Sequence, residues 1–358
     1  MFYKISSYRR WLGSFFHITL NRILGRTFVP HPRRTIFIET SERCNLACRF
    51  CAYPKQRPTG SIMSLEDFQR KVQESVAMGF SQFVLTPMLG EVFADPTIEK
   101  KFDVLEVNPG VESYLFYSNF ILPRETTVRN IATRKKLCEI HISIYGHDRE
   151  SFCNITRKPS IQYKMLLKNL DLLREICGTE PLGSKLFFSM RTIGGITGEN
   201  LPSSELTEGI VELCLTYGAK LDVAENYDTW GGVVTPEDVK PINVKLTEGN
   251  ASYKNGACSL LFGSVQIKAD GIVHACACRD VDGSLRLGNA NDRPLAELLS
   301  FNNSRYRELI ETQQKGYFTN NCQACSFYSS IRDGRARRFD TDRKFLPLGH
   351  ALAILKKT

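Results

Sequence analysis

Several absences narrow the function of this chain before any motif is considered. It contains no uninterrupted apolar run of about 18 residues, the length that a membrane-spanning helix requires. Its N-terminus lacks the apolar core and small-residue cleavage site of a secretory signal peptide. Low-complexity segments and repeats of solenoid period are also missing. These features predict a soluble globular protein in a reducing compartment, for which we expect the cytoplasm.

Acidic residues are scarce at the two ends of the chain. Residues 1–34 carry seven Lys or Arg and no acid, and residues 331–358 carry eight against three Asp. The net charge of +9 is therefore not spread over a working surface, so no nucleic-acid partner is expected. Residues 9–24 read as a basic amphipathic helix, which either packs on the body or makes peripheral contact with a membrane.

Short apolar runs alternate with longer helix-like segments through the first two thirds of the chain. We expect strands at 35–40, 83–86, 113–118, 139–144, 185–190 and 221–224, and helices that include 64–78, 163–176 and 205–217. Six such alternations predict the α/β class, as a partial (β/α)6 barrel followed by a small cysteine-rich α+β domain with a hairpin at 264–274. The expected units are a basic N-terminal helical extension (1–34), the barrel (35–240), the cysteine-rich domain (241–330) and a basic tail (331–358).

Cysteine is the residue in excess, with 12 in 358 residues. Cys44, Cys48 and Cys51 follow directly on the first predicted strand, so their thiols are expected on the loop where α/β barrels place their chemistry. Three cysteines can hold a [4Fe–4S] cluster and leave one iron open for a ligand. Zinc is the alternative, but zinc ribbons pair two Cys-x-x-Cys units and no fourth ligand lies nearby in the sequence.

This Cys-x-x-x-Cys-x-x-Cys motif resembles that of the radical S-adenosylmethionine (SAM) superfamily, and the resemblance extends over residues 35–230. It implies that the open iron binds SAM, with Phe50 near the adenine. Gly90 and Glu91 resemble the end of the family's Gly-Gly-Glu segment, which holds the SAM amino group. Ser143 lies in a stretch similar to the family's Ser-x-Asp-Gly, with Tyr145 in place of Asp. Arg191 matches an arginine that pairs with the SAM carboxylate.

A second constellation comprises Cys258, Cys276, Cys322 and Cys325. Four cysteines can close a [4Fe–4S] cluster or a tetrahedral zinc site, and their spacing does not choose between the two. The pattern, with Asp270-Gly271 in the hairpin, resembles the opening of the SPASM domain. Because no cysteine follows Cys325, it is also similar to the shorter twitch domain, which holds one auxiliary cluster. The resemblance therefore implies two [4Fe–4S] clusters in this chain.

The resemblance implies an enzyme that generates a 5′-deoxyadenosyl radical and takes hydrogen from a C–H bond, using a one-electron reductant such as flavodoxin or ferredoxin. We expect a small-molecule substrate (a sugar, aminocyclitol or similar), oxidised with the auxiliary cluster as electron acceptor. Tyr227, Asp228 and Trp230 follow the sixth strand and are candidate substrate contacts.

Three alternatives stay open. A thiol at Cys278, Cys153 or Cys138 that returns a hydrogen atom would make the enzyme an epimerase. A maturase of a ribosomally made peptide is the second, although only 34 residues precede the first strand, which is short for a leader-binding domain. The third is a non-enzymatic metal-binding module, which would have no use for SAM-binding residues.

Overall fold

The computed structural model describes residues 2–55, 59–86, 88–247, 249, 253–277, 280, 282–335 and 345–357, with only the backbone described for residues 2–10. Six parallel strands form its centre: β2 (Thr35–Ile38), β3 (Gln82–Leu85), β4 (Ser113–Ser118), β5 (Leu137–Tyr145), β6 (Leu186–Arg191) and β7 (Lys220–Val223). Each predicted strand is present, with ends shifted by two residues at most. The prediction of a partial (β/α)6 barrel is confirmed.

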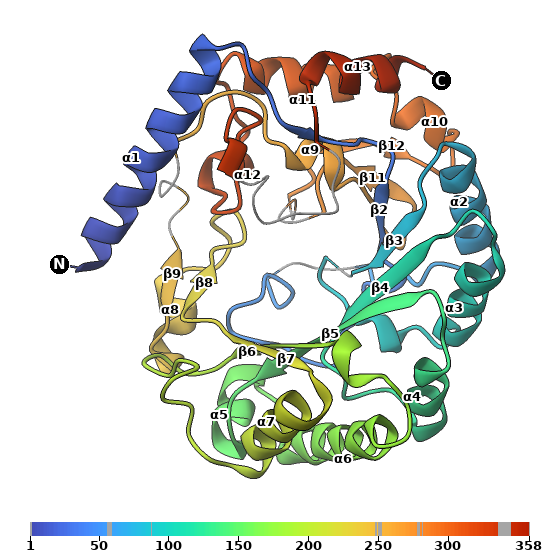
Figure 1. Ribbon diagram of the computed structural model, residues 1–358, viewed down its shortest axis with the longest axis vertical. Helices are drawn as coiled ribbons and strands as arrows, with labels where there is room; N and C mark the ends of the chain where they lie inside the picture. Colours follow the sequence, from blue (N-terminus) through green and yellow to red (C-terminus); the bar gives the residue numbers. More distant parts are fainter. Residues whose placement is uncertain are drawn as a thin grey trace.

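Helices cover the outer face of this curved sheet (Figure 1). They are α2 (Leu65–Ala77), α3 (Ile98–Val107), α4 (Glu125–Ala132), α5 (Arg149–Thr156), α6 (Ser160–Cys177) and α7 (Glu205–Tyr217), with short 3-10 turns η1 (Val92–Ala94), η2 (Gly183–Lys185) and η3 (Lys240–Ile242). Local sequence sets the ends of α7. Ser204 and Thr207 form a capping box at its start, and Gly218 adopts the left-handed conformation at its end, with a φ of 77°.

The sheet does not close on itself but continues into the C-terminal region, by which we mean residues 253–335. Its order is β12-β11-β10-β2-β3-β4-β5-β6-β7, so the neighbour of β2 on its free side is β10 (Gln266–Ile267), which pairs in parallel with it. The predicted hairpin is formed by β10 and β11 (Ile272–His274), and β12 (Arg286–Asn289) extends it. Gly271 takes a φ of 86° in the turn, as a tight hairpin requires. The C-terminal region is thereby fixed to one edge of the barrel.

The remaining elements surround this frame. Near the barrel mouth lie β8 (Asn226–Asp228), α8 (Pro236–Val239) and β9 (Lys245–Thr247), and the C-terminal region adds α9 (Leu260–Gly263), α10 (Leu295–Leu298), α11 (Ser304–Gln314) and α12 (Asn320–Ala324). At the ends of the chain, β1 (Val29–Pro30) pairs with β13 (Phe345–Leu346), which precedes α13 (Leu348–Lys356).

The N-terminal helix α1 (Phe2–Ile23) lies against the C-terminal region (Figure 1). The rings of Trp11 and Phe15 contact Tyr253, with centroids 5.6 Å and 5.1 Å from its ring. None of the helices in the described ranges has the length and apolar character needed to cross a membrane.

Candidate functional site

A cavity of about 420 Å³ opens at the carboxyl ends of the parallel strands. Parallel strands end at the same edge of a barrel, so residues far apart in sequence meet there. The cavity wall contains the three N-terminal cysteines and every predicted cofactor and substrate residue, namely Cys44, Cys48, Cys51, Phe50, Gly90, Glu91, Ser143, Arg191, Tyr227, Asp228 and Trp230. Ala277 and Phe327 of the C-terminal region also line the cavity.

The three thiols after β2 lie close enough for each to affect its neighbours. Cys48 is buried, whereas Cys44 and Cys51 are half-buried. Burial raises the pKa of Cys44 to about 12 and that of Cys48 well above its ordinary value, with further contributions from the neighbouring thiols. The backbone N–H groups of Leu46 and Tyr53 each donate to a sulfur, of Cys44 and Cys51 respectively, at 3.4 Å. Soft sulfur donors that receive N–H bonds suit an iron–sulfur cluster, so these residues fit the group that the motif implies.

Glu91 is buried between the ends of β3 and β4. Its carboxylate accepts hydrogen bonds from the Ser118 hydroxyl at 2.6 Å, from the Asn119 N–H at 2.8 Å and from the Phe93 N–H at 3.3 Å. Burial nevertheless raises its pKa to about 7, because loss of hydration outweighs these bonds. A carboxylate held this firmly in a cavity wall is suited to receive a cationic group.

The backbone before Glu91 is held by a residue that the sequence analysis missed. Glu39, directly after β2, accepts hydrogen bonds from the N–H groups of Met88 at 2.8 Å and Leu89 at 3.4 Å through one oxygen. Its other oxygen is buried and accepts no hydrogen bond from the described residues. At Gly90, a Cβ would lie 2.0 Å from the Ser41 carbonyl oxygen, so no larger residue fits. The loop therefore passes close to the cysteine-bearing segment, an approach with no local sequence signal except the glycine.

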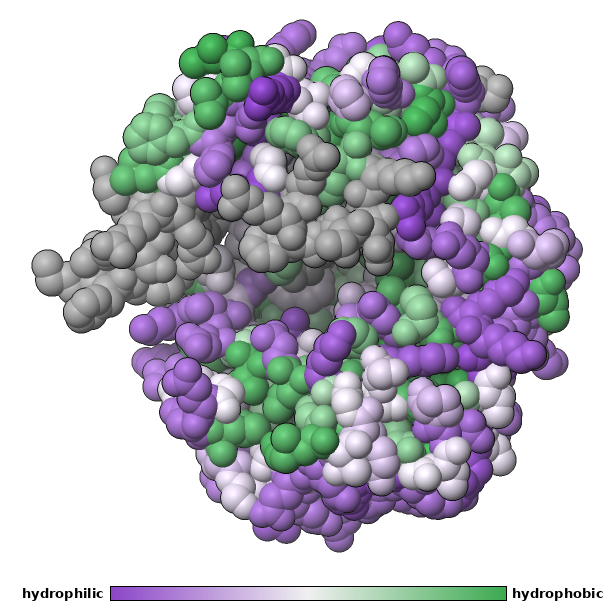
Figure 2. All heavy atoms as spheres, in the orientation of Figure 1, coloured by the Kyte–Doolittle hydropathy of each residue, from purple (hydrophilic) through white to green (hydrophobic). Residues whose placement is uncertain are grey.

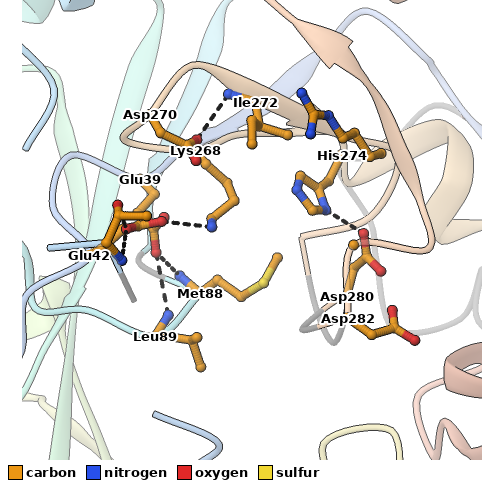
Figure 3. A pocket seen from close by; sticks show the side chains of 13 residues that line it. Glu39, Glu42, Met88, Leu89, Lys268, Asp270, Ile272, His274, Asp280 and Asp282 are labelled. Atoms are coloured by element: carbon orange, nitrogen blue, oxygen red, sulfur yellow. Dashed lines mark hydrogen bonds and ion pairs between the residues drawn. The ribbon is translucent and has the colours of Figure 1, made fainter. Parts of the chain in front are cut away.

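A second cavity, of about 240 Å³, lies behind this loop, and Met88 and Leu89 line both cavities. Lys268, which follows β10, forms an ion pair with Glu42 at 2.7 Å. His274 contacts Asp280 through Nδ1. Figure 3 shows these two pairs on opposite sides of the cavity, with the Met88 side chain extending between them. The Lys268–Glu42 pair ties the hairpin of the C-terminal region to the barrel beside the predicted SAM loop, whereas His274 and Asp280 both belong to the C-terminal region.

Aromatic side chains form one wall of the main cavity around Phe50. The ring of Tyr145 lies 5.3 Å from the Phe50 ring, and that of Tyr227 lies 5.1 Å from it. The Arg191 guanidinium is 5.9 Å from the same ring. Tyr145, which stands where the family motif has Asp, is half-buried, and loss of hydration raises the pKa of its hydroxyl well above the ordinary value. This position therefore carries an aromatic ring where the family motif has a charged carboxylate.

The candidate substrate residues are fixed by hydrogen bonds. Tyr227 is buried and donates its hydroxyl to the Thr192 carbonyl at 2.7 Å. The Trp230 indole N–H donates to the Phe50 carbonyl at 2.9 Å. Asp228 accepts from the Trp230 N–H at 2.7 Å and contacts the Ser326 hydroxyl, next to Cys325. This segment therefore joins the first cysteine loop to the second constellation.

Within the second constellation, three thiols gather around Lys254. Its ammonium donates to the carbonyls of Cys322 at 2.7 Å and Cys325 at 3.0 Å. Burial raises the pKa of Cys258 to about 12, and the Cys322 and Cys325 thiols add to the shift. Cys276 lies half-buried after β11. In the parts of the chain that the structure describes, no three His, Cys, Asp or Glu side chains form a recognisable single-ion site.

The other thiols considered as hydrogen donors lie in different places. Cys153 is on α5, half-buried against the core, and Cys138 is on β5 with an exposed side chain, and neither is in the lining of the main cavity. Cys278 lies outside the described residues.

Comparison with known families agrees with both constellations. The family model of the radical SAM superfamily matches residues 38–202. The model of SPASM, an iron–sulfur cluster-binding domain, matches residues 258–326.

Individual relatives are distant. The GTP 3′,8-cyclase of Desulforamulus reducens is 28% identical over 123 residues, which cover 34% of this chain and 37% of that protein. The tRNA-2-methylthio-N(6)-dimethylallyladenosine synthase of Opitutus terrae is 24% identical over 273 residues, covering 69% and 53%. The chain therefore spans about a third to a half of the length of these curated relatives.

Two solved structures share the fold. BtrN in complex with AdoMet and 2-DOIA has a TM-score of 0.53 and 11% identity, with coverage of 84% of this chain and 95% of BtrN. Streptococcus suis SuiB bound to the precursor peptide SuiA has a TM-score of 0.54 and 13% identity, with coverage of 88% and 75%. With the family matches and the two cysteine constellations together, the chain contains a radical SAM domain over residues 38–202 and a C-terminal SPASM iron–sulfur cluster-binding domain over residues 258–326.

Proposed function

We propose that this enzyme oxidises a small metabolite, such as a sugar or an aminocyclitol, in the cavity between the N-terminal thiols and the C-terminal region. The observation that carries the proposal is the composition of that cavity. Cys44, Cys48 and Cys51 of the barrel line it together with Ala277 and Phe327 of the C-terminal region. A substrate held there lies between the two cysteine constellations.

Bound SAM and two [4Fe–4S] clusters would supply a hydrogen-abstracting radical and an electron acceptor. In the proposal, the Cys44, Cys48 and Cys51 sulfurs hold the first cluster. Glu91 receives the SAM amino group, and the Arg191 guanidinium, with its two parallel N–H bonds, receives the carboxylate.

Two further groups shape the proposed SAM site. Ser143 lines the cavity near the end of β5 and is a candidate hydrogen-bond partner of SAM. Phe50, backed by Tyr145 and Tyr227, offers an apolar surface to the adenine and keeps water from it.

The size of the cavity favours a small substrate. A volume of about 420 Å³ lies toward the lower end of the range for small-molecule sites, and SAM must share it. Tyr227 is buried, whereas Asp228 and Trp230 are half-buried, so Trp230 and Asp228 are the better candidates for substrate contact. Because the fold is shared by proteins crystallised with a small molecule and with a peptide, the fold does not choose between these substrates and the cavity carries the argument.

The position of the second constellation favours oxidation over epimerisation. Asp228 contacts Ser326, which neighbours Cys325, so the substrate wall continues directly into the proposed ligands of the second cluster. Cys258, Cys276, Cys322 and Cys325 are those proposed ligands. An epimerase would need a hydrogen-donating thiol in the cavity, and Cys138 and Cys153 lie elsewhere. Cys278 follows the cavity residue Ala277 and lies outside the described residues, so the heavy-water experiment decides its role.

The substrate class can be tested without knowing the substrate. The reconstituted enzyme is reduced in the presence of SAM and either the small-molecule fraction or the peptide fraction of a cell extract. We expect the small-molecule fraction to raise 5′-deoxyadenosine formation above the substrate-free rate, and Trp230→Ala to weaken that stimulation. Stimulation by the peptide fraction alone would favour a peptide maturase instead.

The reaction type is tested with the metabolite that the fractionation yields. Cys322→Ala should abolish the oxidised product while deoxyadenosine still forms, and Cys214→Ala, a thiol on α7, serves as the matched control. In heavy water an oxidase leaves a carbonyl or unsaturation at the reacting carbon. Solvent deuterium that is deposited there, and that disappears in Cys278→Ala or Cys153→Ala, would show an epimerase.

A further inference from the structure

The N-terminal helix α1 docks on the protein through a face that includes polar residues. Ser14, Ile18 and Asn21 are buried. The Arg335 guanidinium donates to the Ser14 hydroxyl at 2.6 Å, and the Asn21 amide donates to the Arg332 carbonyl at 2.8 Å. These contacts fix which side of the helix faces the protein.

The opposite face of α1 is apolar and exposed to solvent. Phe16 is 65% exposed, Leu20 is 55% exposed and Ile23 is 77% exposed, and Leu24 continues the same side at 49%. Phe16 and Leu20 are four residues apart, and Leu20 and Ile23 are three apart, so these side chains lie on one face of the helix. Figure 2 shows apolar residues gathered over this part of the helix. Such a helix is inverted relative to an ordinary surface helix, whose outward face is polar.

The surroundings of this apolar face are basic. The first 34 residues contain seven Lys or Arg and no Asp or Glu. Arg22 and Arg26 are exposed beside the apolar side chains. An exposed apolar stripe with basic flanks matches the chemistry of an anionic lipid surface, where apolar side chains enter the acyl boundary and cations meet headgroups.

We propose that the face formed by Phe16, Leu20, Ile23 and Leu24 docks on an anionic membrane surface, with α1 parallel to the bilayer. The helix lies on the surface rather than across it, because no described helix can span a bilayer. A second copy of this chain is a poorer occupant, since two such faces would bring basic segments together without a compensating acid.

The test uses the full-length protein and lipid vesicles in a sedimentation assay. We expect binding to phosphatidylcholine vesicles that contain phosphatidylglycerol, weak binding to phosphatidylcholine alone, and a loss of binding as salt is raised. The variant Phe16→Ser/Leu20→Ser/Ile23→Ser should weaken binding by about 100-fold or more. Arg22→Gln/Arg26→Gln should weaken it by about 30-fold, at about fivefold for each charge.

A matched control is available on the barrel. Leu215 on α7 is 83% exposed, and Val107 at the end of α3 is 79% exposed, so Leu215→Ser/Val107→Ser removes comparable exposed apolar side chains elsewhere. This control should bind vesicles as the wild type does. All changed side chains face solvent, so circular dichroism spectra should be unaltered.

Three results would overturn the proposal. One is a wild type that does not sediment with the anionic vesicles, and another is a triple variant that binds as tightly as the wild type. A dimer in light scattering that dissociates in the triple variant would assign the face to a second copy. Each result is independent of the proposed metabolite oxidation, because binding is measured without SAM or reductant.

Discussion

Replacing Glu91 by Gln is expected to weaken SAM binding while leaving the fold intact. Glu91→Ala is a poorer choice, because it leaves three buried donors, on Phe93, Ser118 and Asn119, without an acceptor. Each unsatisfied buried group costs about 1–3 kcal/mol. Gln keeps the shape and one oxygen that accepts from Ser118 and Phe93, so the losses are the negative charge and the single hydrogen bond from the Asn119 N–H.

The size of the effect follows from the bond that is changed. A hydrogen bond to a charged partner contributes about 1.5–3 kcal/mol, which corresponds to about 10- to 150-fold in the dissociation constant. The low-dielectric surroundings of this buried carboxylate favour the upper part of that range.

The assay is equilibrium dialysis of labelled SAM against reconstituted, unreduced enzyme. Glu112→Gln, at an exposed position before β4, is the control and should bind SAM as the wild type does. Iron content must be equal in all samples. Wild-type affinity in Glu91→Gln would remove this carboxylate from the SAM site and refute the reasoning.

Further predictions concern Glu39 and Lys254. Burial raises the pKa of Glu39 from 4.5 to about 7. The protonated side chain therefore contributes about 3 kcal/mol to the free energy of unfolding below pH 4.5, and this contribution is lost as the pH rises through about 7. Glu39→Gln should reduce the fall of the thermal unfolding midpoint between pH 4.5 and pH 7. Wild-type and variant midpoints that fall in parallel with pH would contradict this prediction. Lys254→Met should free the Cys322 and Cys325 carbonyls and lower iron from about eight to about four per chain, with deoxyadenosine formation retained. Unchanged iron content would show that Lys254 does not support the second cluster.

The sequence predicted the barrel well because its signals are local. Apolar runs of strand length alternate with segments of helical period, and the capping box at Ser204 with Gly218 marks both ends of α7. The pairing of β10 with β2 could not be predicted. It joins Gln266 to Phe37 through strands of two and four residues, and nothing in either segment specifies so distant a partner.

In the candidate site, too, locally encoded features were predicted and contacts between distant segments were not. The residues that the radical SAM motifs identify all line the main cavity, since these motifs report chemistry at the ends of predicted strands. Glu39, Tyr145 and Lys254 were missed because their roles arise from contacts between loops. The outward apolar face of α1 was hidden in a nearly continuous apolar run, and only packing distinguishes its buried side.

The central claim is that the loop of Cys44, Cys48 and Cys51 holds the cluster at which SAM is cleaved. The most direct measurement is 5′-deoxyadenosine formed from SAM by the anaerobically reconstituted, reduced protein. We predict slow formation by the wild type without substrate, and none by Cys44→Ala/Cys48→Ala/Cys51→Ala, which should keep the iron of the second constellation. Formation of deoxyadenosine by the triple variant at the wild-type rate, or none by an iron-replete wild type, would contradict the account.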